Sequence, residues 1–426
     1  WSHGGGARCP RCGRRSAAEV IAELNGLFQR GIHRAGTPAR LIAWDWGWAE
    51  EWAPAIIARL PDAVALMSVS EWDLPIRRGG VRTTVGEYSI SAIGPGPRAR
   101  RHWDWAKRRG LRTIAKMQAG NTWELSAVPY LPALENVAQH AANLRAARVD
   151  GLMLGWTLGG YPSPNLEVVS EIAGDTQLAP EAAMARVARR RFGEVSAPAV
   201  VRAWRGFSAA FREFPFSGGL VYDAPMQFGP SNLLWAEPTG YRATMIGFPY
   251  DDLDSWRAVY PAAVFIAQFD KVATGFERAT TELQTFVATH ADKLAPHEQS
   301  ALTAELNVAE AASIHFRSTA NQARFVVARG DLARAASLAA ARPVLQSLAS
   351  ILQAELDLAR RLYRIQGRDS RIGFEASNQY YYVPVDLAEK VLNCRDLLDR
   401  WLPARARRWG DAAQRPFSID APGRLV

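Results

Sequence analysis

The sequence predicts an α/β fold, namely the second half of a (β/α)8 barrel followed by an all-α helical domain. Short apolar strands alternate with helices over the first 195 residues, acids and tryptophans follow the strands, and the rest of the chain has long helical periodicity. Alternating strands and helices are typical of a parallel sheet, and continuously apolar strands indicate burial on both faces.

The composition is that of a globular protein. The 426 residues are 48% hydrophobic and 22% charged, which excludes a disordered or collagen-like chain. No apolar run reaches the roughly 18 residues that a membrane span needs. The formal charge is +9, but its Arg clusters fall on predicted helix ends and loops. We therefore expect neither a membrane nor a nucleic-acid partner.

The elements follow from periodicity and from start and stop signals. The first helix is expected at 17–30, where Ser16 and Glu19 form a capping box. Buried strands are predicted at 40–46, 63–69, 113–118 and 150–156. Further helices are predicted at 50–60, 98–109, 132–147, 166–172, 180–192 and 200–214, and 73–97 is interpreted as a Gly-, Pro- and Arg-rich insertion. No glycine-rich nucleotide motif follows any strand, which favours a barrel over a nucleotide-binding sheet.

Three regions are expected. Residues 1–195 form the barrel portion with strands five to eight, and residues 196–254 form an irregular, loop-rich extension covering the barrel mouth. Residues 255–426 form the C-terminal helical domain. Its helices are predicted at 264–288, 296–329, 331–363 and 385–401.

The candidate catalytic residues are acids at the ends of three successive strands. Asp45, Glu71 and Glu124 should share one cleft, because active sites of barrels lie at the carboxyl ends of the strands. Glycoside hydrolysis needs two carboxyl groups, one of them a general acid. The sequence therefore predicts a glycosidase site at this end of the barrel.

Aromatic and polar residues beside these acids are the candidate substrate-binding groups. A tryptophan can stack on a sugar ring; any single one is more often packed in a core, but the set favours a carbohydrate cleft. The set is Trp44, Trp46, Trp48, Trp72, Trp123 and Trp156. The polar and tyrosine candidates are Asn121, Tyr161, Asn165, Tyr222 and Asp223, each with a turn-forming or structural role as the alternative.

The order of motifs along the chain resembles a known group of enzymes. CPRC, IAWDWGW, SEWD, QAGNTWE and GLMLGWTLGGYPSPN are similar to the second half of the barrel in bacterial glycoside hydrolases related to family 20 hexosaminidases and α-glucuronidases. The resemblance implies a helical domain behind the barrel. It also implies a catalytic pair at the end of strand four, before Trp1. In that case Asp45, Glu71 and Glu124 would bind or support substrate unless the family has shifted its acids.

The cysteines allow a metal site but do not establish one. Cys9 and Cys12 supply half of a zinc site, with His3 nearby, whereas a structural zinc needs four ligands. A plain pair of loop cysteines is the alternative, and we expect no other cofactor. Because the chain opens with Trp1 instead of Met, we expect a piece or processed form of a longer bacterial protein. Any targeting segment would precede Trp1, and the compartment stays unassigned.

The function expected is that of an exo-acting glycoside hydrolase on a terminal sugar, with N-acetylhexosaminides among the candidate substrates. The alternative is a non-catalytic carbohydrate-binding or interaction protein, or an inactive fragment of such a hydrolase. An open half-barrel edge needs covering by a partner or a second copy, so this alternative predicts a homodimer or poor solubility. A third possibility is an α/β hydrolase or transferase acting on another polar substrate.

Overall fold

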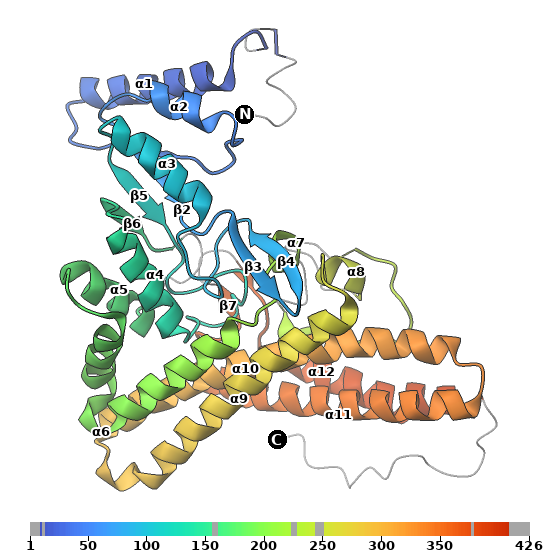
Figure 1. The fold of residues 1–426 in the computed structure, drawn as a ribbon. Helices are drawn as coiled ribbons and strands as arrows, with labels where there is room; N and C mark the ends of the chain where they lie inside the picture. The colour runs from blue at the N-terminus through green and yellow to red at the C-terminus, as the bar shows by residue number, and fades with distance from the viewer. Residues whose placement is uncertain are drawn as a thin grey trace.

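The fold is mostly helical, with one small parallel sheet (Figure 1). The computed structural model describes residues 9–10, 13–155, 161–222, 228–242, 251–375 and 379–408. The sheet has four strands, β1 (Ile42–Trp44), β2 (Ala65–Val69), β5 (Thr113–Lys116) and β6 (Gly151–Met153). All four predicted strands are confirmed, each a few residues shorter than expected.

The strands lie in the order β1-β2-β5-β6, and all pairings are parallel. The order follows the chain without reversal, as in a barrel and unlike a doubly wound sheet. Trp44 pairs with Met67, and Lys116 pairs with both Val69 and Met153. The carboxyl ends therefore meet at one edge. The described residues form a four-stranded sheet and do not show a complete (β/α)8 barrel.

Five helices accompany the sheet. They are α1 (Ala17–Arg34), α2 (Ala53–Arg59), α3 (Pro97–Arg108), α4 (Leu134–Ala146) and α5 (Pro164–Gly174). The capping box of α1 is confirmed, because the Ser16 hydroxyl accepts from the Glu19 amide while the Glu19 carboxylate accepts from the Ser16 amide. Helix α1 packs on α2, α2 on α3, and α4 on α5.

The stretch 73–97, expected to be an irregular insertion, holds a β-hairpin. Strands β3 (Leu74–Arg78) and β4 (Val81–Val85) pair antiparallel. Gly79 and Gly80 form the two-residue turn with φ of 52° and 83°. Such turns require positive φ at both positions, which glycine adopts without steric cost. The hairpin extends from the carboxyl end of β2 toward the helical region (Figure 1).

The helical region contains long helices, as predicted. They are α6 (Pro180–Phe211), α9 (Ala262–Thr289), α10 (Pro296–Arg334), α11 (Leu338–Arg368) and α12 (Pro384–Asp396). Helix α9 packs on both α6 and α10, and α11 packs on α10 and α12. The short elements are α7 (Gly218–Tyr222), η1 (Gly229–Ser231), α8 (Leu253–Trp256), η2 (Ala291–Lys293), β7 (Phe374–Glu375), β8 (Gln379–Tyr380), η3 (Leu397–Trp401) and α13 (Leu402–Arg407).

The two helices expected at 180–192 and 200–214 are both found, on either side of a kink within the one element α6. It runs through the expected regional boundary at residue 195, with a kink at Gly193, where φ is 79° and ψ is 167°. Only glycine occupies this backbone region readily. On account of this kink, α6 packs against α4 and α5 beside the sheet and also against α9 and α10 of the bundle.

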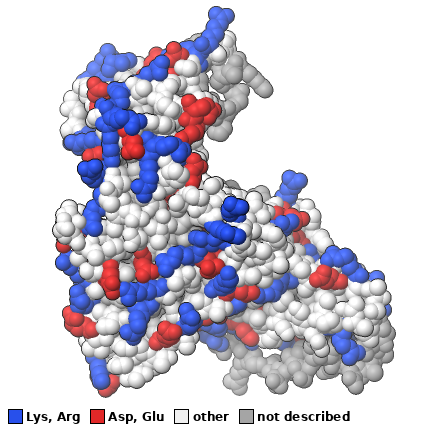
Figure 2. Space-filling model, in the orientation of Figure 1, with Lys and Arg blue, Asp and Glu red and all other residues white. Residues whose placement is uncertain are grey.

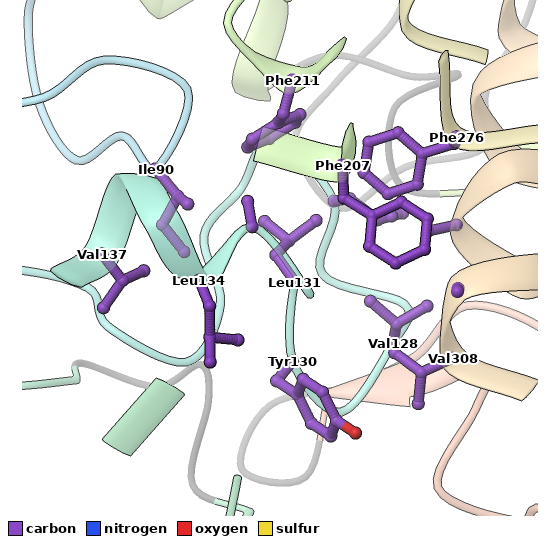
Figure 3. Packing of buried hydrophobic residues seen from close by; sticks show 14 of the residues in the cluster. Ile90, Val128, Tyr130, Leu131, Leu134, Val137, Phe207, Phe211, Phe276 and Val308 are labelled. Carbon is purple, nitrogen blue, oxygen red and sulfur yellow. The ribbon is translucent and has the colours of Figure 1, made fainter. Parts of the chain in front are cut away.

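The largest apolar core joins the loop after β5 to the bundle. Figure 3 shows Tyr130 and Leu131 of this loop beside Phe207 of α6, with Phe276 of α9 close by. The hydroxyl of Tyr130 donates to the buried carboxyl group of Glu305 on α10. The bundle therefore holds the segment that carries Asn121 and Glu124, two of the predicted site residues.

The surface carries both signs of charge intermixed (Figure 2). Arg190, for example, pairs with Glu167 and Glu171 at 2.8 and 2.7 Å. Within the described residues, none of the helices combines the length and apolar character needed to cross a bilayer. The expected absence of a nucleic-acid partner stays a prediction.

The kink in α6 gives the first testable prediction. A Cβ at Gly193 would lie 1.7 Å from Glu298 Oε1, and the positive φ strains any other residue. We expect Gly193→Ala to lower the free energy of unfolding by about 1–3 kcal/mol in urea denaturation. The control is Gly31→Ala in α1, where a Cβ meets nothing within 4 Å, so a gain of up to about 1 kcal/mol is expected. Equal effects of the two changes would contradict this account.

Candidate active site

The three predicted acids all lie behind the carboxyl ends of the strands, and all three are fully buried. Asp45 follows β1 directly, Glu71 follows β2 by two residues, and Glu124 lies in the loop after β5. A buried carboxyl group must be paired, hydrogen-bonded or protonated. The three acids meet this requirement in different ways, and these differences indicate different roles in the site.

Asp45 is held by groups from β2 and α3. One carboxylate oxygen lies 2.5 Å from the Ser68 hydroxyl and 2.7 Å from His102 Nδ1, and the other lies 3.2 Å from the Arg98 guanidinium. Arg98 also stacks over the Trp72 ring at 4.6 Å and donates to the backbone carbonyls of Asp45 and Trp48. These contacts join the loop after β1 to α3.

Glu124 accepts hydrogen bonds from the segment that follows the hairpin and fixes its position. Its two oxygens accept from the hydroxyl of Ser89 and the amide of Ile90, both at 2.7 Å, and from the hydroxyl of Thr122 at 2.8 Å. Burial raises the pKa of the Glu124 carboxyl group, while these hydrogen bonds act to lower it. The fixed segment includes Glu87 and Tyr88, which lie next to the strand ends.

Glu71 is an acid for which burial is the largest influence on the pKa, and no Arg or Lys forms an ion pair with it within 4 Å among the described residues. Its Oε2 accepts from the Ser70 hydroxyl at 2.7 Å, whereas Oε1 has no hydrogen-bond partner among the described residues. His140 Nδ1 on α4 lies 3.7 Å from this oxygen, too far for a good hydrogen bond. Burial raises the pKa of Glu71 to about 8 and lowers the pKa of His140 to about 3. At neutral pH Glu71 thus carries a proton and His140 is uncharged.

A close backbone contact fixes where Glu71 lies. The amide of Gly96, at the start of α3, donates to the Ser70 carbonyl at 2.6 Å. A Cβ on Gly96 would lie 2.2 Å from the Trp72 carbonyl oxygen, so only glycine fits. The first turn of α3 therefore sits directly on the end of β2. This contact brings Arg98 and His102 to Asp45 on one side of Glu71.

Lys116 is a site residue that the sequence analysis missed. This lysine ends β5 and is fully buried. Its ammonium lies 4.6 Å from the centre of the Tyr88 ring and 3.3 Å from Gln118 Oε1. Burial lowers the pKa of Lys116 to about 8, while the nearby Glu71 and Glu87 carboxylates act to raise it. We call Glu71, Glu87, Tyr88, Lys116 and Gln118 the Lys116 cluster.

The cluster reaches solvent through Glu87 and Trp46. Glu87 is 8% exposed, and its Oε1 accepts from Trp46 Nε1 at 2.9 Å. Burial raises the pKa of Glu87, and neither its Oε2 nor Gln118 Nε2 has a hydrogen-bond partner among the described residues. Trp46 is 47% exposed, and its ring lies 5.8 Å from that of Trp44. The hydrogen bond to Glu87 thus connects the exposed Trp46 with the buried polar groups of the cluster.

Other predicted binding residues have structural contacts. Trp48 packs against the apolar cluster around α2, and buried Trp123 contacts the half-buried Tyr222 at 6.1 Å between ring centres. Asn121 bonds within its own loop. Asn165 donates to the carbonyls of Ala119 and Leu131 at 2.8 and 2.7 Å. These side chains shape the loops around the site.

Several of the remaining predicted site residues lie outside the residues that the structure describes. Tyr161 is half-buried at the edge of the segment before α5. Trp156, Asp223, Cys12 and His3 lie outside the described residues, and so does part of the expected zinc site. Cys9 is half-buried. Among the residues described, no group of three or more His, Cys, Asp or Glu could hold a metal ion, so zinc at Cys9 and Cys12 stays a prediction.

A solved structure shares this fold. It is that of a GH138 enzyme targeting pectin rhamnogalacturonan II, which superposes with a TM-score of 0.53 at 9% sequence identity. The fold is glycoside hydrolase-like. The similarity covers 91% of this chain and 60% of that enzyme, so the chain spans less than two thirds of its neighbour's length. No protein-family model matches, and neither does any curated protein sequence. The expected relation to family 20 hexosaminidases and α-glucuronidases is not confirmed.

The protonation of Glu71 gives a prediction for stability. The folded-state pKa is about 8 against an ordinary value of 4.5. Below the ordinary value both folded and unfolded chains hold the proton. As pH rises from 4.5 to 8 the unfolded chain loses it first, so Glu71 lowers the free energy of unfolding, on the order of a few kcal/mol.

Glu71→Gln carries no proton to lose and escapes this penalty. We expect the melting temperature of the variant to rise relative to the natural chain between pH 5 and pH 8.5, measured by thermal denaturation in matched buffers. Glu51→Gln, at an exposed position after β1, serves as the control and should show no such trend. A difference that is independent of pH would contradict a protonated Glu71.

Proposed function

We propose that this protein is a glycoside hydrolase in which Glu71 and Glu87 are the two carboxyl groups of the reaction. The observation that carries the proposal is the placement of two buried carboxyl groups, Glu71 and Glu87, near the buried ammonium of Lys116, with Glu87 bonded to the exposed Trp46. Glycoside hydrolysis needs one carboxylic acid to protonate the leaving oxygen and one carboxylate to act as base or nucleophile. The glycoside hydrolase-like fold supports this reaction class.

The division of roles follows from the surroundings of each acid. Glu71 holds a proton at neutral pH and its Oε1 has no protein partner among the described residues, so it suits the general acid. Glu87 borders the solvent and receives a hydrogen bond from Trp46, so it suits the second carboxylate. Asp45 and Glu124 accept bonds from surrounding protein groups and serve as positioning residues.

The substrate we propose is a terminal sugar whose ring stacks on Trp46. Exposed tryptophan beside polar groups fits the apolar face and the hydroxyls of a sugar. Pectin rhamnogalacturonan II, which the GH138 neighbour targets, belongs in the first substrate screen. N-acetylhexosaminides and glucuronides belong there because the motif order resembles enzymes that cleave them.

The two acids provide a direct test of activity. We expect p-nitrophenyl glycosides or pectin oligosaccharides cleaved by the natural chain to lose turnover by at least about 100-fold in Glu71→Gln and in Glu87→Gln. Glu51→Gln keeps full turnover, because its exposed side chain lies outside the Lys116 cluster. Normal turnover in Glu71→Gln would remove that residue from the mechanism.

The pH dependence of turnover gives a second test. An ionised Glu87 is needed, so kcat/KM falls as pH drops through its raised pKa. A protonated Glu71 is needed too, so kcat/KM falls again as pH rises through about 8. Lys116→Met removes the cation that favours ionised carboxylates and should move both limbs to higher pH. An activity that keeps rising above pH 9 would contradict the assignment of Glu71.

A non-catalytic carbohydrate-binding protein is the second candidate function. The complete burial of Glu71 and the exposure of Trp46 favour it, because a sugar can stack on the tryptophan without reaching the acid. Sugar binding that quenches Trp46 fluorescence, is lost in Trp46→Ala and occurs without turnover on any screened glycoside would select this alternative.

A further inference from the structure

One histidine of α3 contacts both ends of the loop that carries Trp46. This loop, residues 45–52, joins β1 to α2, and the fully buried His102 lies against it. His102 Nδ1 lies 2.7 Å from a carboxylate oxygen of Asp45, and Nε2 lies 3.1 Å from a carboxylate oxygen of Glu50. Asp45 directly precedes Trp46, and Glu50 follows it by four residues. The imidazole therefore connects the start of the loop with its far half.

Both carboxyl groups also accept hydrogen bonds from other donors. Asp45 lies 3.2 Å from the Arg98 guanidinium and accepts from a serine hydroxyl of β2. Glu50 Oε1 accepts from Nη2 and Nε of Arg101 at 2.6 and 2.9 Å. Burial acts to raise the pKa of Glu50, but the hydrogen bonds and charges of Arg101 and His102 hold this pKa below its ordinary value. Carboxyl groups in such surroundings are ionised, and an ionised carboxylate accepts hydrogen bonds without donating any.

The imidazole must therefore supply both hydrogens. Each of its ring nitrogens faces an acceptor, and a histidine that donates from both nitrogens is an imidazolium. The ring of Trp105 stacks on it at 5.3 Å between ring centres. The other charged groups at this end of α3 are Arg98, which faces both carboxylates, and Arg101, which pairs with Glu50 and lies 3.7 Å from Asp73.

The two carboxylates differ in their access to water. Asp45 is fully buried, whereas the Glu50 side chain is 41% exposed. A proton that leaves His102 therefore leaves from Nε2, on the Glu50 side, while the Nδ1 hydrogen stays with Asp45. The lone pair left on Nε2 then faces a carboxylate and repels it. Glu50 keeps only its arginine partners, and this half of the loop loses its attachment to His102.

We propose that His102, as an imidazolium, is the positioning residue that holds Trp46 in place for the sugar, and that loss of its proton releases the loop and weakens sugar binding. The inference rests on the proposed function, because it takes Trp46 as the residue on which the sugar stacks. Trp46 also donates to Glu87, so the position of the loop determines where the indole meets the second carboxylate. Arg98 donates to the backbone carbonyls of Asp45 and Trp48 and holds the first turn of the loop in both states.

Nitrogen-15 NMR of the histidine rings tests the charge of His102 without any sugar. The chain has 7 histidines, and the signals of His102 are those missing from His102→Gln. At pH 7 we expect both of its ring nitrogens to have the chemical shifts of protonated nitrogens. A neutral ring with a single N–H would overturn the proposal, whether or not the protein binds sugars.

The pH dependence of sugar binding tests the release of the loop. The probes are N-acetylglucosamine and oligosaccharides of pectin rhamnogalacturonan II, titrated calorimetrically. We expect the affinity to fall about 10-fold as His102 loses its proton, the order of magnitude that one charge-assisted hydrogen bond contributes. His102→Gln replaces one of the two donors and should bind weakly at every pH. His33→Gln, at an exposed position of α1, is the control and should follow the natural chain.

Glu50→Gln separates the charge of His102 from a purely structural role. The amide of this variant accepts from a protonated Nε2 and donates to a deprotonated one, so tight binding should persist at every pH. The variant also provides the test if His102→Gln does not fold. Because binding can respond to Glu71 and Glu87 as well, only the pH dependence that both variants remove is assigned to His102.

The outcomes distinguish this inference from the proposed function. Sugar binding whose pH dependence is unchanged in His102→Gln and Glu50→Gln would overturn the inference and leave the proposed function intact. Binding of neither probe by the natural chain would count against the proposed function. In that case the indole N–H signal of Trp46, assigned with Trp46→Phe, should still shift as His102 loses its proton. An indole signal that does not respond would overturn the release of the loop.

Discussion

The ionisable groups behind the carboxyl ends of the parallel strands are buried, and the surrounding protein must offset the desolvation cost of each one. Asp45 obtains an arginine, a histidine and a hydroxyl. Glu124 obtains backbone amides and hydroxyls. For Glu71 the effect of burial outweighs the hydrogen bonds that it accepts, and the carboxyl group retains a proton. A buried group that is left undercompensated in this way is a typical feature of functional sites.

The same compensation determines which elements must touch. Arg98 and His102 tie α3 to Asp45, directly after β1. Glu305 of α10 holds both Tyr130 of the loop after β5 and Trp204 of α6. The helical bundle is therefore part of the support of the strand ends. A change deep in the bundle can alter the site without touching any residue of the Lys116 cluster.

The sequence predicted the parts of this arrangement that depend on local pattern. Strand periodicity located all four strands, and their ends located Asp45, Glu71 and Glu124. The hairpin was not predicted because the Gly, Pro and Arg content of 73–97 indicates an irregular insertion, although Gly79 and Gly80 between short alternating strands are the signal of a hairpin turn. Lys116 escaped because one lysine at the end of an apolar strand has no motif. That isolated charge was the signal available.

Other features depend on contacts between distant residues and could not be predicted. Glu87 meets Lys116 only because the hairpin folds back on the strand ends, and Glu124 holds its segment there. Trp123 and Trp46 differ in exposure. Trp123 is buried against Tyr222, whereas Trp46 faces solvent. Exposure, which distinguishes a core tryptophan from a binding tryptophan, is a property of the folded chain and not of its local sequence.

The protonation state of Glu71 is the centre of this account, and it can be observed directly. The measurement is a carbon-13 NMR titration of glutamate carboxyl groups in the natural chain and in Glu71→Gln. We expect one carboxyl resonance that titrates near pH 8 in the natural chain and is missing from the variant. A Glu71 resonance that titrates near the ordinary value of 4.5 would mean that the acid is ionised at neutral pH, and the assignment of Glu71 as the proton donor would fail.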